Sequence, residues 1–348
     1  MINKPIVLIM CGGRSLRLWP LSEYKSKNFI DIFGFSPLEL TIKRFLKITP
    51  RQNIFLVANF NEKKSLSQIK LINKENIFFE PESKNTAAAI LLSVFKLRQR
   101  FGENRTMIVS PVDHLIKGKG FGRAMEKSFR AAEQGFICTL GIAPDKPTPN
   151  FGYIQLGKKE GEGLFRVKRF IEKPSLAEAV KLIKKGDTFF NSGMFIATLK
   201  SFNREFKEYY PFYLEFFRVF NCSRAGDNEI GRLYKGIADV PFDKAVMEKT
   251  KLACVVKDSF YWKDFGSWQA VAEVLPKDAR RNVRKGDVFC CDSSDNFIHL
   301  DDPKKKVLAL GIKDIFYIEA KDYVLLANRE YIDNIKAALR EFKSNRKR

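Results

Sequence analysis

The sequence predicts an α/β fold, in which a mostly parallel sheet flanked by helices is followed by a small all-β unit. Two observations carry this prediction. Short apolar segments alternate with amphipathic stretches of helical spacing over residues 6–141, a pattern typical of a parallel sheet covered by helices. From about residue 282, short extended segments follow one another between Asp, Asn, Gly and Pro turns, which indicates a separate β unit, with a solenoid as one possible form.

The expected elements follow in order along the chain. Strands are expected over residues 6–10, 53–58, 77–79, 106–110 and 136–141, and helices over 38–48, 61–72, 86–101 and 122–134. The β unit is expected to contain strands over 288–291, 297–300, 306–310, 315–319 and 323–327, closed by a helix over 329–342. The change of pattern places a boundary near residues 276–285, so the predicted domains are 1–280 and 281–348.

Composition narrows the class of protein. The chain has 348 residues, of which 45% are hydrophobic, and no apolar run reaches the roughly 18 residues needed to cross a bilayer. The apolar segment 6–10 is too short for the core of a signal peptide, so a cytoplasmic protein is expected. Six cysteines without C-x-x-C spacing and only two histidines argue against a zinc site.

The net charge of +22, from 62 Lys and Arg against 40 Asp and Glu, favours anionic partners. The lysines are scattered along the chain, and the 32 phenylalanines are typical of a core, so neither nucleic acid nor a membrane is the expected partner. A basic peripheral membrane protein remains an alternative, which flotation with anionic vesicles would test.

The loop after the first strand carries the clearest chemistry. Residues 11–27 read CGGRSLRLWPLSEYKSK. Gly12 and Gly13 allow backbone N–H groups to approach an anion, and Arg17 and Lys27 add positive charge for phosphate oxygens. The spacing is neither G-x-G-x-x-G nor the P-loop pattern, and an ordinary turn with solvated basic side chains explains this loop taken alone about equally well.

Two aspartates follow predicted strands, Asp113 directly and Asp264 within Tyr-Trp-Lys-Asp-Phe-Gly. A magnesium ion that carries nucleotide phosphates needs only one or two protein carboxylates. Either aspartate alone is more often a turn or helix-capping residue. Two further segments, FIEKP over 170–174 and FNSGMF over 190–195, combine polar and apolar residues unusually, although neither is specific by itself.

Read in order, eight segments resemble the sugar-1-phosphate nucleotidyltransferases, and among them the mannose-1-phosphate guanylyltransferases. The loop matches the family's A-G-G-x-G-T-R-L-W-P-L-S and its following lysine, and residues 80–90 resemble E-P-x-x-R-N-T-A-P-A-I. Asp113-His114 matches A-D-H, Phe151 to Ile154 resembles Y-G-Y-I, and the segments at 170 and 191 match F-x-E-K-P and N-S-G-M-F. Residues 243–249 and 262–268 resemble D-Y-A-V-M-E-K and W-x-D-V-G-S-W.

The resemblance implies a Rossmann-like nucleotide domain, a small C-terminal left-handed β-helix with a closing helix, and a homodimer. It implies Mg²⁺-dependent, in-line transfer from GTP to mannose 1-phosphate, giving GDP-mannose and pyrophosphate. Some family members carry a further isomerase domain after the last helix, and that activity is not expected here.

The resemblance also assigns roles to residues. The catalytic residues it implies are Arg17, Lys27, Asp113 and Asp264, with Asp113 and Asp264 as metal ligands. The nucleotide-binding residues are Cys11, Gly12, Gly13, Arg14, Ser15, Asn85, Thr86 and Asp113. The residues that bind the sugar phosphate are Gly152, Glu172, Lys173 and Asn191.

The loop departs from the family pattern at two positions, where Ser15 and Leu16 replace a glycine and a threonine. If position 15 adopts a positive φ, serine costs on the order of 1 kcal/mol there. Two alternatives therefore stay open. One is nucleotidyl transfer to another hexose or heptose 1-phosphate, and the other is a weakly catalytic regulatory homologue that binds nucleotide sugars.

Overall fold

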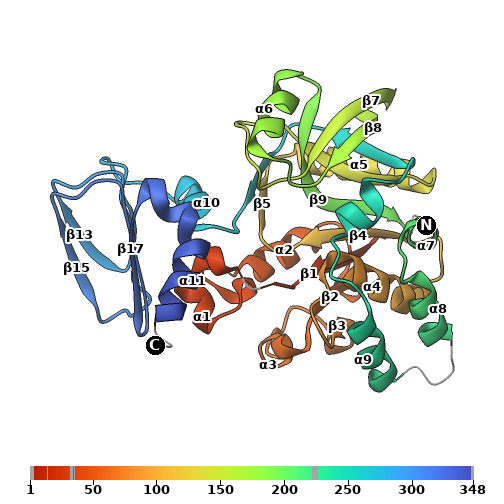
Figure 1. Ribbon diagram of the computed structural model, residues 1–348, viewed down its shortest axis with the longest axis horizontal. Coiled ribbons are helices and arrows are strands. Elements are labelled where there is room, and N and C mark those ends of the chain that lie inside the picture. Colours follow the sequence, from red (N-terminus) through yellow and green to blue (C-terminus); the bar gives the residue numbers. More distant parts are fainter. Residues whose placement is uncertain (1–3, 14, 32–33, 35, 222–225, 346–348) are drawn as a thin grey trace. The chain divides into compact units, whose positions relative to one another are not determined.

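The computed structural model describes residues 4–13, 15–31, 34, 36–221 and 226–345 (Figure 1). The described chain divides into two compact units. Unit 1 comprises the described parts of residues 1–12, 41–112 and 116–262, and unit 2 those of residues 13–40, 113–115 and 263–348. The α/β class is confirmed in that both units combine helices with sheets.

Unit 1 is built on a sheet with the strand order β3-β2-β1-β4-β9-β6-β10-β8-β7. Its strands are β1 (Ile6–Met10), β2 (Ile54–Asn59), β3 (Ile77–Glu80), β4 (Thr106–Pro111), β6 (Ile137–Ile142), β7 (Tyr153–Gly161), β8 (Leu164–Ile171), β9 (Thr188–Thr198) and β10 (Ala253–Lys257). The predicted parallel order holds for β3, β2, β1 and β4 and for β6 beside β10. However, β9 enters antiparallel between β4 and β6, and β7 and β8 are also antiparallel, so the sheet is mixed.

Helices cover both faces of this sheet. They are α2 (Pro37–Phe45), which begins in unit 2, α3 (Lys63–Leu66), α4 (Asn85–Phe101), α5 (Gly120–Glu133), α6 (Leu176–Lys184), α7 (Leu199–Tyr209), α8 (Tyr213–Asn221) and α9 (Asp227–Gly236). The alternate residues Ile6 and Leu8 of β1 join the core that contains α4, while Val7 and Ile9 are equally buried outside that cluster. Side chains therefore pack on both faces of the strand, as parallel sheets require.

The helix expected over residues 61–72 is wrong, because α3 ends at Leu66. Within that stretch only Leu66 and Ile72 are buried, so a longer helix would have almost no apolar face to pack. The other predicted helices of this part are present, with α2 ending earlier, at Phe45, than its pattern suggested.

Unit 2 contains the predicted C-terminal strands. They are β13 (Asp287–Cys291), β14 (Phe297–His299), β15 (Lys306–Leu310), β16 (Ile315–Ala320) and β17 (Tyr323–Asn328), and the sequence pattern missed the short β12 (Val283–Lys285). β12, β14 and β16 pair in parallel, as do β13 and β15. The closing helix begins as a 3₁₀ turn over Arg329–Asn334 and continues as α11 (Ile335–Asn345).

The core of unit 2 joins the two ends of the chain. Short helices η1 (Leu16–Leu18) and α1 (Leu21–Tyr24) pack with α10 (Trp268–Val274) and the C-terminal strands, and η2 (Lys27–Phe29) follows α1 along the chain. The Trp268 Nε1–H donates to the backbone oxygen of Trp19 at 2.7 Å. The pair β5 (His114–Lys117) and β11 (Tyr261–Asp264) forms a separate two-stranded sheet.

Candidate active site

The two predicted metal-binding aspartates and two predicted cationic residues lie together in unit 2. Lys27 Nζ is 2.8 Å from Asp113 Oδ2, and both side chains are largely buried, with 17% and 14% exposed. The backbone N–H of Phe265 donates to the Asp113 backbone oxygen at 2.8 Å, which places Asp264 beside this pair. The short β5–β11 pairing thus explains why carboxylates from positions 113 and 264 meet.

Arg17 approaches the same carboxylates across Gly266. A Cβ atom on Gly266 would lie 2.8 Å from Arg17 Nη2 and 2.9 Å from Asp264 Oδ1, closer than side chains allow. The Gly266 N–H also donates to Asp264 Oδ1 at 2.6 Å. Glycine at this position leaves room for the guanidinium and the carboxylate side by side.

Burial and the charges of this cluster move the pKa values of the two carboxyl groups in opposite directions. Burial raises the pKa of Asp113, but the adjacent Lys27 and His114 outweigh it and bring that pKa to about 2. Burial and then the charge of Asp113 raise the pKa of Asp264 to about 6, against the opposing effect of Arg17 and Lys27. Two neighbouring carboxyls with separated pKa values are typical of functional sites.

In the loop after β1, position 15 does not adopt the positive φ that would strain a serine. Gly13 has a φ of +94°, a conformation that favours glycine. Ser15 has a φ of −84°, so serine is unstrained there. Its Oγ–H donates to the Gly266 backbone oxygen at 2.9 Å, tying the loop to the turn after Asp264. Leu16 is 39% exposed.

The other predicted nucleotide-binding residues divide as follows. Cys11 is buried at the end of β1, where its N–H donates to Val57 O at 2.8 Å, and a Cβ atom on Gly12, which follows it, would meet no other atom within 4 Å. Arg14 lies outside the described residues. Asn85, with a φ of +63°, and Thr86 form the first turn of α4. His114 is buried in β5.

The predicted sugar-phosphate residues lie together in unit 1. A Cβ on Gly152 would lie 2.7 Å from Glu172 Oε2 and 3.3 Å from Asn191 Cβ, so a larger residue would displace the Glu172 carboxylate. The Asn191 N–H donates to Gly152 O at 2.8 Å. Lys173 Nζ donates to Glu172 Oε1 at 2.5 Å from a side chain that is 62% exposed.

Two acidic residues beside this cluster were not selected from the sequence, although both stand in the segment 243–249 quoted above. Asp243 Oδ1 accepts a hydrogen bond from Asn191 Nδ2 at 2.9 Å, and Glu248 Oε1 accepts one from the Glu172 backbone N–H at 2.9 Å. Burial and then the charge of Glu172 raise the pKa of Asp243 to about 7. The acidic residues near both ends of segment 243–249 are the sequence signal that could have identified them.

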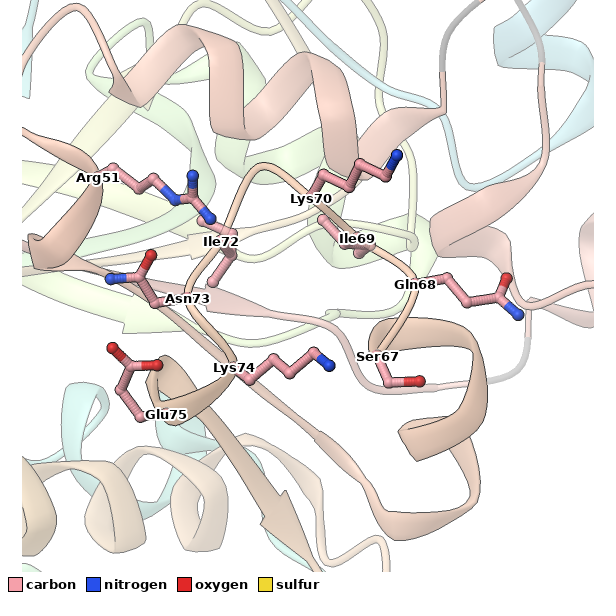
Figure 2. A pocket seen from close by; sticks show the side chains of 9 residues that line it. All are labelled: Arg51, Ser67, Gln68, Ile69, Lys70, Ile72, Asn73, Lys74 and Glu75. Atoms are coloured by element: carbon pink, nitrogen blue, oxygen red, sulfur yellow. The ribbon is translucent and has the colours of Figure 1, made fainter.

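A pocket elsewhere in unit 1 contains none of the predicted site residues. Figure 2 shows the side chains that line it, around the turn that follows α3. The pocket has a volume of about 780 Å³. The side chains of Arg51, Lys70, Lys74 and Glu75 that line it are exposed. Because the charged side chains that line this pocket are exposed to solvent, we assign the chemistry to the two clusters described above.

Two features of the described residues bear on metals and membranes. No group of three or more His, Cys, Asp or Glu side chains converges on a metal position among them. This leaves the aspartate pair, a donor set that suits an ion completed by water and phosphate. Within the described ranges, no helix is sufficiently long and apolar to span a bilayer.

Comparison with known proteins gives consistent matches over nearly the whole chain. Residues 6–281 match the model of the nucleotidyl transferase family. Mannose-1-phosphate guanylyltransferases from Escherichia coli and Klebsiella pneumoniae are each 34% identical to this chain, over 98% of it and 74% of their own length. The crystal structure of a mannose-1-phosphate geranyltransferase from Thermus thermophilus superposes with a TM-score of 0.87 at 28% identity, covering 98% of this chain and 100% of that one.

Proposed function

This chain belongs to the nucleotidyl transferase family, and from that premise we propose that it transfers the guanylyl group of GTP to mannose 1-phosphate. A phosphate oxygen of the sugar phosphate attacks the α-phosphorus of GTP, the bond to the β-phosphate breaks, and pyrophosphate leaves. The observation that carries the proposal is the meeting of Arg17, Lys27, Asp113 and Asp264 in one charged cluster.

The reaction requires positioning and neutralisation of charge more than proton transfer. Arg17 and Lys27 are proposed to hold the triphosphate oxygens, and Gly12 and Gly13 to offer backbone N–H groups in the same loop. Asn85 and Thr86 are proposed to contact the nucleoside. On the sugar side, Gly152 and Glu172 would receive hydroxyl groups, and Asn191 would donate its remaining N–H to one of them. Lys173 would pair with the phosphate.

Asp113 and Asp264 fit a magnesium ion. Their oxygens are the donors that Mg²⁺ prefers, and the charge of Asp113 raises the pKa of Asp264, a repulsion that a divalent cation relieves. When held by these two carboxylates, the ion would supply positive charge that neutralises the nucleotide phosphates. Lys27 Nζ also lies 2.8 Å from Asp113, and the charge of Arg17 opposes the rise in the pKa of Asp264.

A panel of nucleoside triphosphates and sugar 1-phosphates, assayed by pyrophosphate release, tests this proposal. GTP with mannose 1-phosphate should give the highest kcat/KM, and Asp264→Asn should lower it at least about 100-fold. Asp287→Asn, at an exposed position of β13, is the matched control. Preferred turnover of another pair would replace the mannose assignment, and full activity of Asp264→Asn would remove Asp264 from the reaction.

The C-terminal region is proposed to form a small left-handed β-helix and to support a homodimer. The parallel pairings of β12, β14 and β16 and of β13 and β15 support the first proposal. The second is supported by exposed apolar side chains on β13 and β15, since Phe289 is 65% exposed opposite Leu308, which is 68% exposed. Light scattering should find a dimer that Leu308→Lys dissociates.

Two further assignments made from the sequence stay proposals. The domain division 1–280 and 281–348 is supported by the family match, which ends at residue 281. A cytoplasmic location is supported by the described cysteines Cys138, Cys254, Cys290 and Cys291, which are thiols and not disulfides.

A further inference from the structure

Asp243 begins an unusual helical turn beside the proposed sugar side. Residues Asp243–Met247 form a π-helix, in which the Glu248 N–H donates to Asp243 O at 2.9 Å. Such turns cost stability relative to an α-helix and concentrate at functional sites. The turn leaves the Asp243 side chain partly exposed while Ala245, Val246 and Met247 are buried.

Asn191 has little hydrogen-bonding capacity left for a ligand. Its Oδ1 accepts from Thr139 Oγ1 at 2.7 Å and from the Gly193 N–H at 3.1 Å, and its Nδ2 donates to Asp243 Oδ1 at 2.9 Å. These contacts fix the orientation of the amide and leave one N–H on Nδ2. A carboxylate, in contrast, has about four acceptor positions, so Asp243 keeps capacity for a hydroxyl donor.

Thr86 holds the segment that precedes Asp243. The Phe242 N–H donates to Thr86 Oγ1 at 2.8 Å, and the Ala87 N–H donates to Val240 O at 3.3 Å. Phe242 is itself fully buried against Phe195, with ring centroids 4.8 Å apart. The first turn of α4 is therefore joined to the start of the π-helix.

From these contacts we propose that Asp243 is a specificity-determining residue, which accepts a hydrogen bond from a hydroxyl group of the hexose phosphate and is positioned through Phe242 by Thr86. This inference rests on the proposed function. Asp243 orients Asn191 and presents its remaining acceptor positions beside Glu172. A site that hydrogen-bonds a substrate hydroxyl discriminates strongly against analogues that lack it.

Steady-state kinetics of Asp243→Asn test this role. Asparagine keeps an oxygen for Asn191 Nδ2 but loses charge and acceptor capacity. The KM for mannose 1-phosphate should rise at least tenfold, the KM for GTP should stay within twofold, and discrimination against deoxymannose 1-phosphates should fall. Asp239→Asn, at an exposed position before the π-helix, is the control that should match the parent. An unchanged KM for mannose 1-phosphate, or equal rises in both KM values, overturns the role of Asp243.

A second pair of variants tests the link through position 86. Thr86→Val removes the acceptor for Phe242 at nearly constant volume, and Thr86→Ser restores it. The KM for mannose 1-phosphate should rise several-fold in Thr86→Val, by more than the KM for GTP, which the proposed contact of Thr86 with the nucleoside also affects. Thr86→Ser should return the KM for mannose 1-phosphate towards the parent. No change in that KM in Thr86→Val overturns the link. A parent that turns over other substrates but not GTP with mannose 1-phosphate overturns the proposed function instead, and the same variants then report on the sugar phosphate that is used.

Discussion

Lys27 Nζ lies 2.8 Å from Asp113 Oδ2, which makes one predicted phosphate-binding cation the partner of one predicted metal ligand. The pair joins the end of the loop after β1 to the start of β5. Lys27 therefore has two roles in the proposed reaction. It holds Asp113 ionised before the substrates bind, and it supplies positive charge for the triphosphate once they do.

Lys27→Met should lower kcat/KM at least about 100-fold, because preorganised charge at a transferring phosphate is worth this much or more. The variant should also raise the pKa of Asp113 above its present value of about 2, since burial then lacks its main opposing charge. Lys25→Met is the matched control, because Lys25 is half-exposed in a 3.6 Å pair with Asp301. Near-parental kcat/KM in Lys27→Met would contradict the assignment.

Gly266→Ala should reduce activity sharply, because its Cβ would stand 2.8 Å from Arg17 Nη2 and force the guanidinium away from Asp264. Gly231→Ala in α9 is the control, as nothing lies within 4 Å of its Cβ position. Turnover and thermal unfolding should be measured for both variants. Equal turnover in the two would show that the place of Arg17 does not matter.

Glu80→Gln should stabilise the protein at alkaline pH. Burial raises the pKa of Glu80 to about 8 from its usual 4.5, against a hydrogen bond from Tyr234. The stabilisation from this protonated group is complete below pH 4.5 and is lost as pH rises through 8. Between pH 6 and pH 9 the parent should lose about 3 kcal/mol more unfolding free energy than the variant.

Urea unfolding at the two pH values gives this difference directly. Glu82→Gln, two residues away, is the control and should follow the parent. The same loss in Glu80→Gln as in the parent would mean that Glu80 ionises normally in the folded protein.

His299→Gln should flatten the acid side of the stability profile. Burial lowers the pKa of His299 to about 4 from 6.5, and the side chain is only 2% exposed. The contribution of the neutral imidazole to the free energy of unfolding is complete above pH 6.5. As pH falls from 6.5 to 4, about 3 kcal/mol of this free energy is lost. Parallel profiles of parent and variant across this window would refute the assignment.

The sequence identified which residues belong to each cluster better than it predicted the contacts that those residues make. Asp113, Asp264 and Lys27 were identified because family motifs name them, and the structure brings them together. Asp243 was missed, because its contact with Asn191 depends on a π-helix that no periodicity indicates. The position of β9 between β4 and β6 could likewise not be predicted from the sequence, since strand order depends on contacts between distant segments.

Ser15 illustrates the limit of reasoning from a replaced glycine. A positive φ was the condition for strain, and within the described part of residues 11–27 it is Gly13 that has one. At φ −84° the serine side chain contributes a hydrogen bond to Gly266 O instead. The departure from the family pattern at position 15 is therefore compatible with the loop's conformation.

Unit 2 is made of segments that lie far apart in the sequence, and this has a consequence for synthesis on the ribosome. Trp19 is translated 249 residues before its partner Trp268. Until then the loop with Arg17 and Lys27 lacks the core that supports it, whereas most of the sheet of unit 1 is already complete. The nascent chain should thus acquire a folded sheet early and its charged cluster late, so that prematurely terminated chains would be compact but inactive.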